Sequence, residues 1–271
     1  MRNATRSTGE AVVVKLLHAR SRELEILQHL HSIKSPYNHT IPLLDTLKLN
    51  MGTFIVLPEA TPLNLGFAFG EFRSNVLDFS RQLIDGVAYL HGRGIAHLGI
   101  KPQNIVALPN QLFIIDFDIA VRVDGADTLI DRWCGTPGWM APEIGRQDGP
   151  RCLYSPIRAD LWSCGLMLRY LASKGAVKEY QFEALADQLL NNNPRLRPLL
   201  SSQSPFTVGH SLSEGGLKRK RDAPPHDAKR LAIGTAHDKY GVNFRLEELE
   251  NDTKKGGWAE KVDQLCVRDE S

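Results

Sequence analysis

Residues 104–117, NIVALPNQLFIIDF, constrain the fold more than any other stretch of this 271-residue chain. Two apolar, strand-like runs are separated by Pro109 and Asn110, a dipeptide typical of turns, so we expect a β-hairpin. A hairpin brings its two ends together, which places Asn104 near Asp116. An acid that ends an apolar strand is costly to bury without a partner. The hairpin therefore predicts a polar site where its ends meet.

The patterns on either side of this hairpin indicate an α+β fold. Strand-like runs occupy residues 10–17, 40–50 and 52–59, and helical patterns occupy residues 21–33, 75–91 and 159–173. The last helix is apolar on nearly every side, which is typical of a buried helix. We expect a small sheet with one helix, followed by a mainly helical region.

The composition narrows the classes of protein that the chain can belong to. With 42% hydrophobic and 24% charged residues it can bury a core, and a net charge of +2 indicates no nucleic-acid or membrane partner for the whole chain. The four cysteines form no CxxC pair, which favours an intracellular protein without a disulfide framework or a zinc site. No apolar run reaches the roughly 18 residues that a membrane helix needs.

Five short motifs follow one another along the chain: HLGIKPQN at 97–104, DFD at 116–118, APE at 141–143, DLWSCG at 160–165 and NPRLRP at 193–198. In order and composition they resemble the motifs of the eukaryotic protein kinase family, over roughly residues 8–200. Lys101 and the stretch GTPGWMAPE are of the serine/threonine type rather than the tyrosine type. The resemblance implies a two-lobed fold, with an incomplete small lobe at 1–60, a helical lobe at 61–200 and a tail at 201–271.

The resemblance also implies an ATP site in the small lobe. Lys15, near the end of its strand, would pair with the α- and β-phosphates. Glu23 is expected to position Lys15, because ELEIL at 23–27 matches the family's E-x-x-I-L pattern, whereas Glu25 lies about 200° away around the helix. Taken singly, such residues are more often solvated surface charges, so the ordered motifs carry this interpretation.

Further site residues are implied at the ends of the hairpin. Asp116 and Asn104 would hold Mg²⁺ through oxygen ligands, which suit a hard cation. Lys101 would contact the γ-phosphate and offset its developing charge. Thr136 would line the entrance for a protein substrate. Asp116 and Asn104 are thus the expected metal ligands, and Lys101 and Asn104 belong to the expected catalytic loop.

Other motif residues are expected to hold the structure together. His97 would stack with Phe117 and Leu27 between the lobes, as a packing residue rather than a catalyst. Asp160 and a pair formed by Glu143 and Arg197 would hold the larger lobe together.

Three positions depart from the family pattern. Gly99 stands where the family has the aspartate that accepts the substrate's hydroxyl proton. Leu98 replaces the arginine that receives an activation-loop phosphate, and Asp118 replaces a flexible glycine. Asp118 is a candidate for an extra metal ligand or a substitute base. These departures predict reduced or absent phosphoryl transfer.

The front of the domain also departs from the family. Only RSTGEAVVVK leads up to Lys15, and Gly9 alone cannot form the glycine-rich loop that covers the phosphates. The segment from Asp160 to Arg197 is shorter than in most of the family. A truncated gene model and a biological loss of the loop are both open as explanations.

The tail predicts a separate function. After about residue 200 the apolar periodicity ends, so we expect disorder there. KRKR at 218–221 followed by KR at 229–230 resembles a two-part nuclear-import signal, and a solvated charge run explains it equally well. The tail lacks interleaved aromatic residues, which disfavours specific nucleic-acid binding.

Three functions remain open from the sequence. The first is a working serine/threonine kinase that transfers phosphate from Mg-ATP to a protein. The second is a pseudokinase-like module that acts by binding a protein partner. The third is a nuclear adaptor that depends on the basic tail. Location is accordingly expected to be cytoplasmic or nuclear, and neither the protein substrate nor the partner is indicated.

Overall fold

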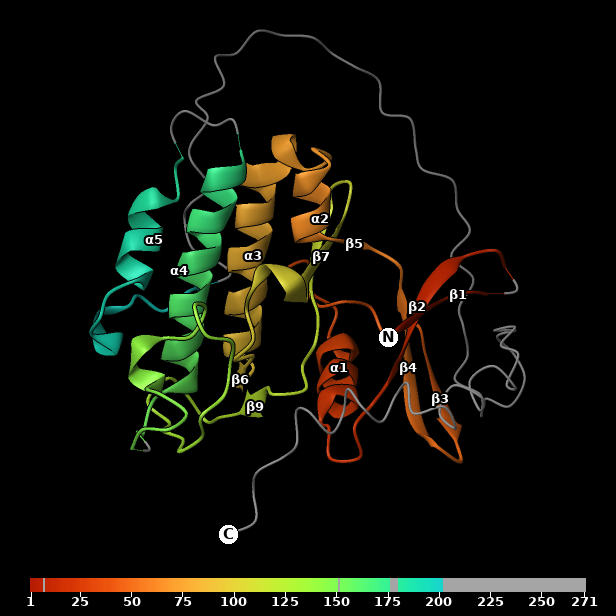
Figure 1. Cartoon of the computed structure of the whole chain (residues 1–271), viewed down its shortest axis with the longest axis horizontal. Helices are drawn as coiled ribbons and strands as arrows, with labels where there is room; N and C mark the ends of the chain where they lie inside the picture. Colours follow the sequence, from red (N-terminus) through yellow and green to blue (C-terminus); the bar gives the residue numbers. More distant parts are fainter. Residues whose placement is uncertain (7, 151, 176–179, 202–271) are drawn as a thin grey trace, which may run out of the picture.

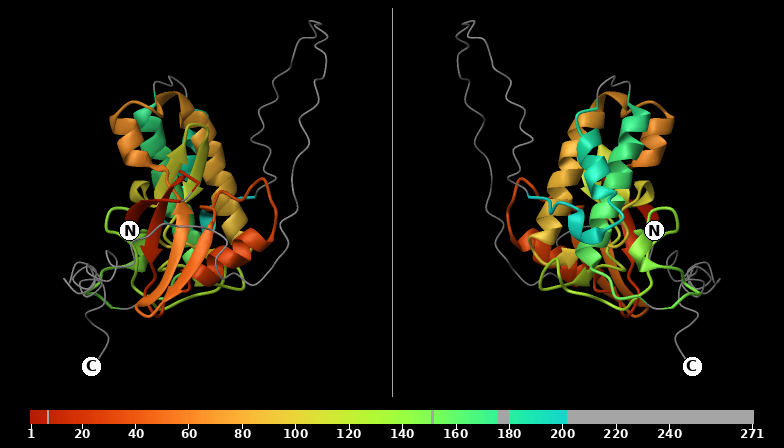
Figure 2. Two further views of the ribbon diagram at one scale, coloured as in Figure 1. Left: turned by 90° about the vertical axis from the view of Figure 1, so that its right-hand side faces the viewer. Right: turned by 90° about the vertical axis from the view of Figure 1, so that its left-hand side faces the viewer.

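The computed structural model describes residues 1–6, 8–150, 152–175 and 180–201, which form two lobes (Figure 1). A four-stranded sheet and helix α1 form the small lobe. Helices α2 to α5 and three short β-pairings form the large lobe, and Figure 2 shows both lobes from two further sides. The predicted disorder of the tail and the predicted import signal concern residues outside the described part of the chain, apart from Ser201.

The elements run in chain order as β1 (Arg2–Thr5), β2 (Ala11–Leu16), α1 (Glu23–Ser32), β3 (Asp45–Leu49), β4 (Gly52–Pro58), β5 (Thr61–Pro62), α2 (Leu63–Ala68), α3 (Val76–His91), β6 (Ile95–Ala96), β7 (Ile105–Leu108), β8 (Gln111–Ile114), β9 (Val121–Arg122), α4 (Pro156–Lys174) and α5 (Glu183–Leu189). Short 3-10 turns lie at Arg73–Asn75, Pro102–Asn104, Pro142–Ile144 and Pro194–Leu196. The α+β fold expected from the sequence is confirmed.

The small sheet has the antiparallel strand order β1-β2-β4-β3. Strand β4 is buried on both faces, because Phe54 and Val56 pack with the valines of β2 while Ile55 and Leu57 join the main core. Strand β1 was not predicted. It is a mostly exposed edge strand, so it carries no alternating apolar signal that a sequence pattern could show.

The predicted hairpin forms strands β7 and β8, which pair from Ile105↔Ile114 to Leu108↔Gln111 around the turn at Pro109 and Asn110. The segment before β3 runs beside this hairpin, because Ile114 N–H donates to the His39 carbonyl over 2.7 Å. The hairpin is therefore attached to both lobes.

The main core is continuous between the lobes. Leu27 and Leu30 of α1 belong to the same buried cluster as the apolar faces of α3, α4 and α5. Helix α4 begins with Ser155 as its N-cap, whose Oγ accepts from Arg158 N–H over 3.2 Å, and with Pro156 in the first turn. No helix in the described residues is long and apolar enough to cross a membrane.

Candidate functional site

Lys15 belongs to strand β2, and its side chain reaches both helix α1 and the end of the hairpin. Its Nζ donates to Glu23 Oε2 over 2.6 Å and to Asp116 Oδ1 over 2.7 Å. Glu23 begins α1 and is 1% exposed, whereas Glu25 points outward and pairs with Arg122 over 3.3 Å. The structure thus brings together Lys15, Glu23 and Asp116, which the sequence analysis grouped, and leaves Glu25 outside the group.

Burial and charge act against each other on the pKa values of this group. Burial lowers the pKa of Lys15, but Glu23, Asp116 and Asp118 outweigh it and raise the pKa above its usual value. Burial raises the pKa of Glu23 to about 7, and the attraction of Lys15 opposes this shift. Lys15 therefore stays a cation at neutral pH, which suits a residue that is to bind phosphate.

Asp116 follows β8 and turns the chain toward Lys15. Its φ of +69° is in the left-handed region, which Asp tolerates better than most residues. Asn104 lies at the other end of the hairpin, where its backbone carbonyl accepts from Ile115 N–H over 3.0 Å. The Asn104 side-chain amide nitrogen donates to the Gly99 carbonyl over 3.0 Å, so the side-chain oxygen is the atom that a metal would use.

The donor set fits the magnesium ion that the resemblance implies. One carboxylate oxygen from each of Glu23, Asp116 and Asp118 lies within 4.8 Å of the others, but all three carboxylates contact Lys15 Nζ. The atoms that would serve magnesium are therefore oxygens of Asp116 and Asn104 rather than the cluster as a whole. Carboxylate and amide oxygens are the ligands that Mg²⁺ prefers, and the Asp116 side chain is 35% exposed, so water and phosphate can reach it.

The loop before the hairpin is held by Asp160, a fully buried residue of α4. Its two carboxylate oxygens accept from His97 N–H over 2.6 Å and from Leu98 N–H over 2.7 Å. These bonds hold Leu98 at a φ of +60°, a conformation that costs a residue with a Cβ roughly 1–3 kcal/mol. Asp160 therefore stabilises the backbone that presents Gly99.

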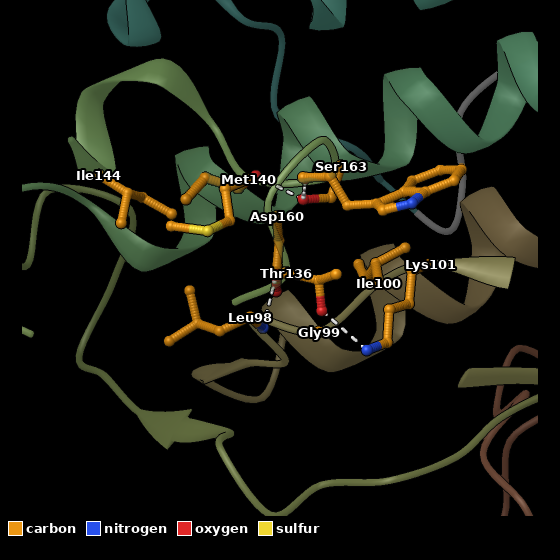
Figure 3. A pocket seen from close by; sticks show the side chains of 11 residues that line it. Leu98, Gly99, Ile100, Lys101, Thr136, Met140, Ile144, Asp160 and Ser163 are labelled. Atoms are coloured by element: carbon orange, nitrogen blue, oxygen red, sulfur yellow. Dashed lines mark hydrogen bonds between the residues drawn. The ribbon is translucent and has the colours of Figure 1, made fainter. Parts of the chain in front are cut away.

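Gly99 leaves the position of the family's base without a side chain. Its N–H donates to His97 Nδ1 over 3.1 Å, and a Cβ built on it would lie 3.2 Å from Asn104 Nδ2 and from His97 Nδ1. Beside it, Lys101 Nζ donates to Thr136 Oγ1 over 2.8 Å, as Figure 3 shows. The hollow between these residues has a volume of about 10 Å³, near the roughly 10–15 Å³ that one water needs.

His97 packs at the centre of the molecule. Its ring lies 4.8 Å from that of Phe117, edge to face, and Leu27 is buried in the core that includes Phe117. His97 Nδ1 accepts from Gly99 N–H, so Nε2 carries the proton and donates to the Ile115 carbonyl over 3.0 Å. Burial lowers the pKa of His97. Protonation of Nδ1 would also break the hydrogen bond that this atom accepts from Gly99 N–H.

Glu143 and Arg197 form a partly buried bidentate pair, with distances of 2.5 and 2.8 Å between the guanidinium nitrogens and the carboxylate oxygens. Arg197 also donates to the carbonyls of Asn191 and Arg158 and lies over the Trp162 ring. This pair joins the segment after Thr136 to the end of the domain.

Asp118 and Ser21 belong to the site in a way that the sequence analysis missed. Asp118 Oδ2 lies 3.0 Å from Lys15 Nζ, and Asp118 Oδ1 accepts from Ser21 Oγ over 2.6 Å. From the sequence, Asp118 is a candidate only for an extra metal ligand or a substitute base. The available signal was the presence of an acid two residues after Asp116, and nothing in the sequence indicated Ser21.

Comparison with known proteins agrees with this geometry. A family model described as "Protein kinase domain" matches residues 4–198, which is more than half of the chain. A lysine paired with a helix glutamate and an aspartate, beside a loop with the motif HLGIKPQN, is the arrangement expected for a kinase of this kind. The chain therefore belongs to the eukaryotic protein kinase family.

Similar proteins include several plant kinases. "CBL-interacting protein kinase 16" of Oryza sativa subsp. japonica is 32% identical over 60% of this chain and 38% of the rice protein. "CBL-interacting serine/threonine-protein kinase 8" of Arabidopsis thaliana is 38% identical over 36% of this chain and 21% of its own length. "CBL-interacting protein kinase 30" of rice is 27% identical over 73% of this chain and 44% of its own length. The chain thus spans less than half the length of these relatives.

Proposed function

We propose that this chain is a serine/threonine-type kinase domain that binds Mg-ATP and transfers phosphate slowly or not at all. The observation that carries the nucleotide site is the buried Lys15, which is held within 2.7 Å of both Glu23 and Asp116. A buried ammonium among carboxylates is costly to maintain and suits an anionic ligand that arrives with a cation. The proposal divides the protein into a small lobe at 1–60, a large lobe at 61–200 and a tail.

In the proposed site each residue has one task. Lys15 contacts the α- and β-phosphates, and Glu23 holds Lys15 in place. Asp116 and Asn104 provide the oxygen ligands for Mg²⁺, which neutralises phosphate charge when it is bound. Lys101 contacts the γ-phosphate and offsets the charge that develops there, and Thr136 positions the Lys101 ammonium through their 2.8 Å hydrogen bond.

Gly99 is the reason for proposing weak catalysis. No side chain at this position can accept the proton of a substrate hydroxyl or orient that hydroxyl for attack. General-base assistance is typically worth about 10²–10⁴ in rate, which corresponds to roughly 3–5.5 kcal/mol of barrier. The protein substrate would still bind near Thr136, and the chemical step would be slow.

A second candidate function is a pseudokinase scaffold that acts by binding a protein partner. The observation that favours it is the small volume of the hollow beside Gly99, about 10 Å³, in a lining where Lys101 and Thr136 are bonded to each other. If the basic segments at 218–221 and 229–230 direct nuclear import, this scaffold acts in the nucleus. Deletion of residues 202–271 with imaging tests the import signal, and an unchanged cytoplasmic distribution would remove its support.

The nucleotide site is tested by thermal melting with and without Mg-ATP. A ligand that binds only the folded state at about ten times its Kd stabilises that state by about 1.4 kcal/mol, which raises the melting temperature by about 3–6 °C. We expect this rise for the wild type and its loss in Asp116→Asn. The matched control is Asp78→Asn, the same change at an exposed acid of α3 that pairs with Arg81. A folded wild type with no shift contradicts nucleotide binding.

A further inference from the structure

Asp118 joins three segments that meet at the nucleotide site. One carboxylate oxygen lies 3.0 Å from Lys15 Nζ on β2, and the other accepts from Ser21 Oγ over 2.6 Å. Ser21 Oγ in turn accepts from the N–H of Glu23, at the first residue of α1, over 3.2 Å. The loop after β8 is therefore connected to both β2 and the start of α1 through one side chain.

The backbone at this position accepts a side chain without strain. Among the described residues only Leu98 and Asp116 adopt a positive φ without being glycine, so Asp118 is outside the left-handed region. The aspartate at this position thus replaces the family's glycine at no conformational cost. Its contacts, rather than its backbone, distinguish it from glycine.

The charge around Lys15 is unbalanced. The single ammonium of Lys15 faces the carboxylates of Glu23, Asp116 and Asp118. In the family pattern a glycine stands at position 118, so the third carboxylate is not present there. Phosphate groups that approach Lys15 meet an additional negative charge, and they must share or take over the ammonium donor that Asp118 now uses. The Asp118 side chain is 39% exposed, so solvent and an entering ligand can reach it.

We propose that Asp118 is a positioning residue that holds Lys15 and the start of α1 in their assembled arrangement before nucleotide binds, and that it competes with the nucleotide phosphates for Lys15. The competition between Asp118 and the nucleotide phosphates rests on the proposed function. The role of Asp118 in positioning Lys15 and α1 does not depend on that function. Asp118 is not a substitute base, because both of its oxygens are directed to Lys15 and Ser21. It is also absent from the lining of the hollow beside Gly99.

The competition is tested by calorimetric titration of the full chain with Mg-ATP. In Asp118→Asn the charge is removed while the size of the side chain is kept, so we expect affinity to rise by at least tenfold. Phosphates that contact Lys15 Nζ would lie within about 6 Å of the Asp118 carboxylate, and at an effective dielectric of about 20 a unit charge at that distance is worth up to about a hundredfold. The control is Asp124→Asn, an exposed acid that follows strand β9, for which we expect less than a twofold change. Equal or weaker binding by Asp118→Asn contradicts the competition.

The holding of α1 is tested without any nucleotide. Ser21→Ala and Asp118→Ala should each lower the melting temperature by about 2–4 °C, and the double variant should lose less than the sum, because the two side chains share one hydrogen bond. Additive losses, or no loss in either single variant, contradict the positioning role.

The two measurements separate the inference from the proposed function. If no variant binds Mg-ATP, both the proposed function and the competition are contradicted. The coupling between Ser21 and Asp118 then decides the positioning role by itself. If only Asp118→Asn binds Mg-ATP, the competition is supported in its strongest form, since Asp118 alone would then block the site.

Discussion

Two residues with a side chain, Leu98 and Asp116, adopt left-handed backbone conformations on either side of the proposed site. Each is held by charged partners, since Asp160 accepts from Leu98 N–H and Lys15 donates to Asp116. Strain of this kind persists where surrounding contacts determine the backbone, and it is common at sites that bind ligands. Leu98 and Asp116 thus mark two loops whose backbone conformation is determined by contacts with charged side chains.

His97 predicts a specific pH dependence of stability. Burial lowers the pKa of His97. As the pH falls through about 6.5, the His97 ring therefore binds a proton in the unfolded chain but stays neutral in the folded chain. The stability due to neutral His97 is complete above that pH and is lost as the pH falls below it, by at most about 1.4 kcal/mol per pH unit. Melting between pH 7.5 and 5 should therefore show a shallower decline in His97→Gln than in the wild type.

The matched control for this prediction is His18→Gln, which changes an exposed histidine of the small lobe in the same way. Its melting temperature should decline with pH as steeply as that of the wild type. An identical decline in His97→Gln and the wild type would show that His97 does not resist protonation in the folded state.

At the scale of elements, the pairing of Glu143 with Arg197 joins the 3-10 turns Pro142–Ile144 and Pro194–Leu196 across the large lobe. Arg197 is fully buried and also satisfies the carbonyls of Asn191 and Arg158, so these groups depend on one side chain. Both turns are short and have few internal hydrogen bonds. The pair thus links the two turns to each other, while Arg158 of α4 donates to the carbonyls of Pro194 and Arg195 in the second turn.

Removal of Arg197 should be strongly destabilising. Arg197→Ala leaves a partly buried carboxylate and two carbonyls without their donor, so we expect a loss of about 3–5 kcal/mol in the free energy of unfolding by urea denaturation. The control is Arg169→Ala, which breaks an exposed pair with Asp187 and should cost less than about 1 kcal/mol. Similar losses in both variants would contradict the structural role of Arg197.

The elements that the sequence predicted are the long or strongly patterned ones. Helices α1, α3 and α4 and the β7–β8 hairpin have clear apolar patterns, whereas α2 and α5 have six and seven residues, too few for two helical turns. Within the site, the grouping of Lys15, Glu23 and Asp116 could be predicted from the order of the motifs along the chain. The contact of Ser21 with Asp118 joins residues 97 positions apart, and no local pattern encodes such a contact.

For the whole molecule, several independent connections hold the lobes together. The chain crosses from β4 to β5, residues 39–41 pair beside β8, and Lys15 on β2 binds Asp116 after β8. The proposed site lies where these connections converge. The molecule thus has the frame of a protein kinase domain, with Gly99 at the position where the family pattern has an aspartate.

The most direct test of this account is single-turnover phosphoryl transfer from Mg-ATP by the wild type and Gly99→Asp. Gly99 is not in the left-handed region, and the added Cβ requires Asn104 and His97 to move by only a few tenths of an ångström. Gly99→Asn is the control, because it adds a side chain of the same size that cannot act as a base. We predict that Gly99→Asp is faster than the wild type and Gly99→Asn by about 10²–10⁴. Equal rates in all three, with Mg-ATP bound to each, would contradict the account.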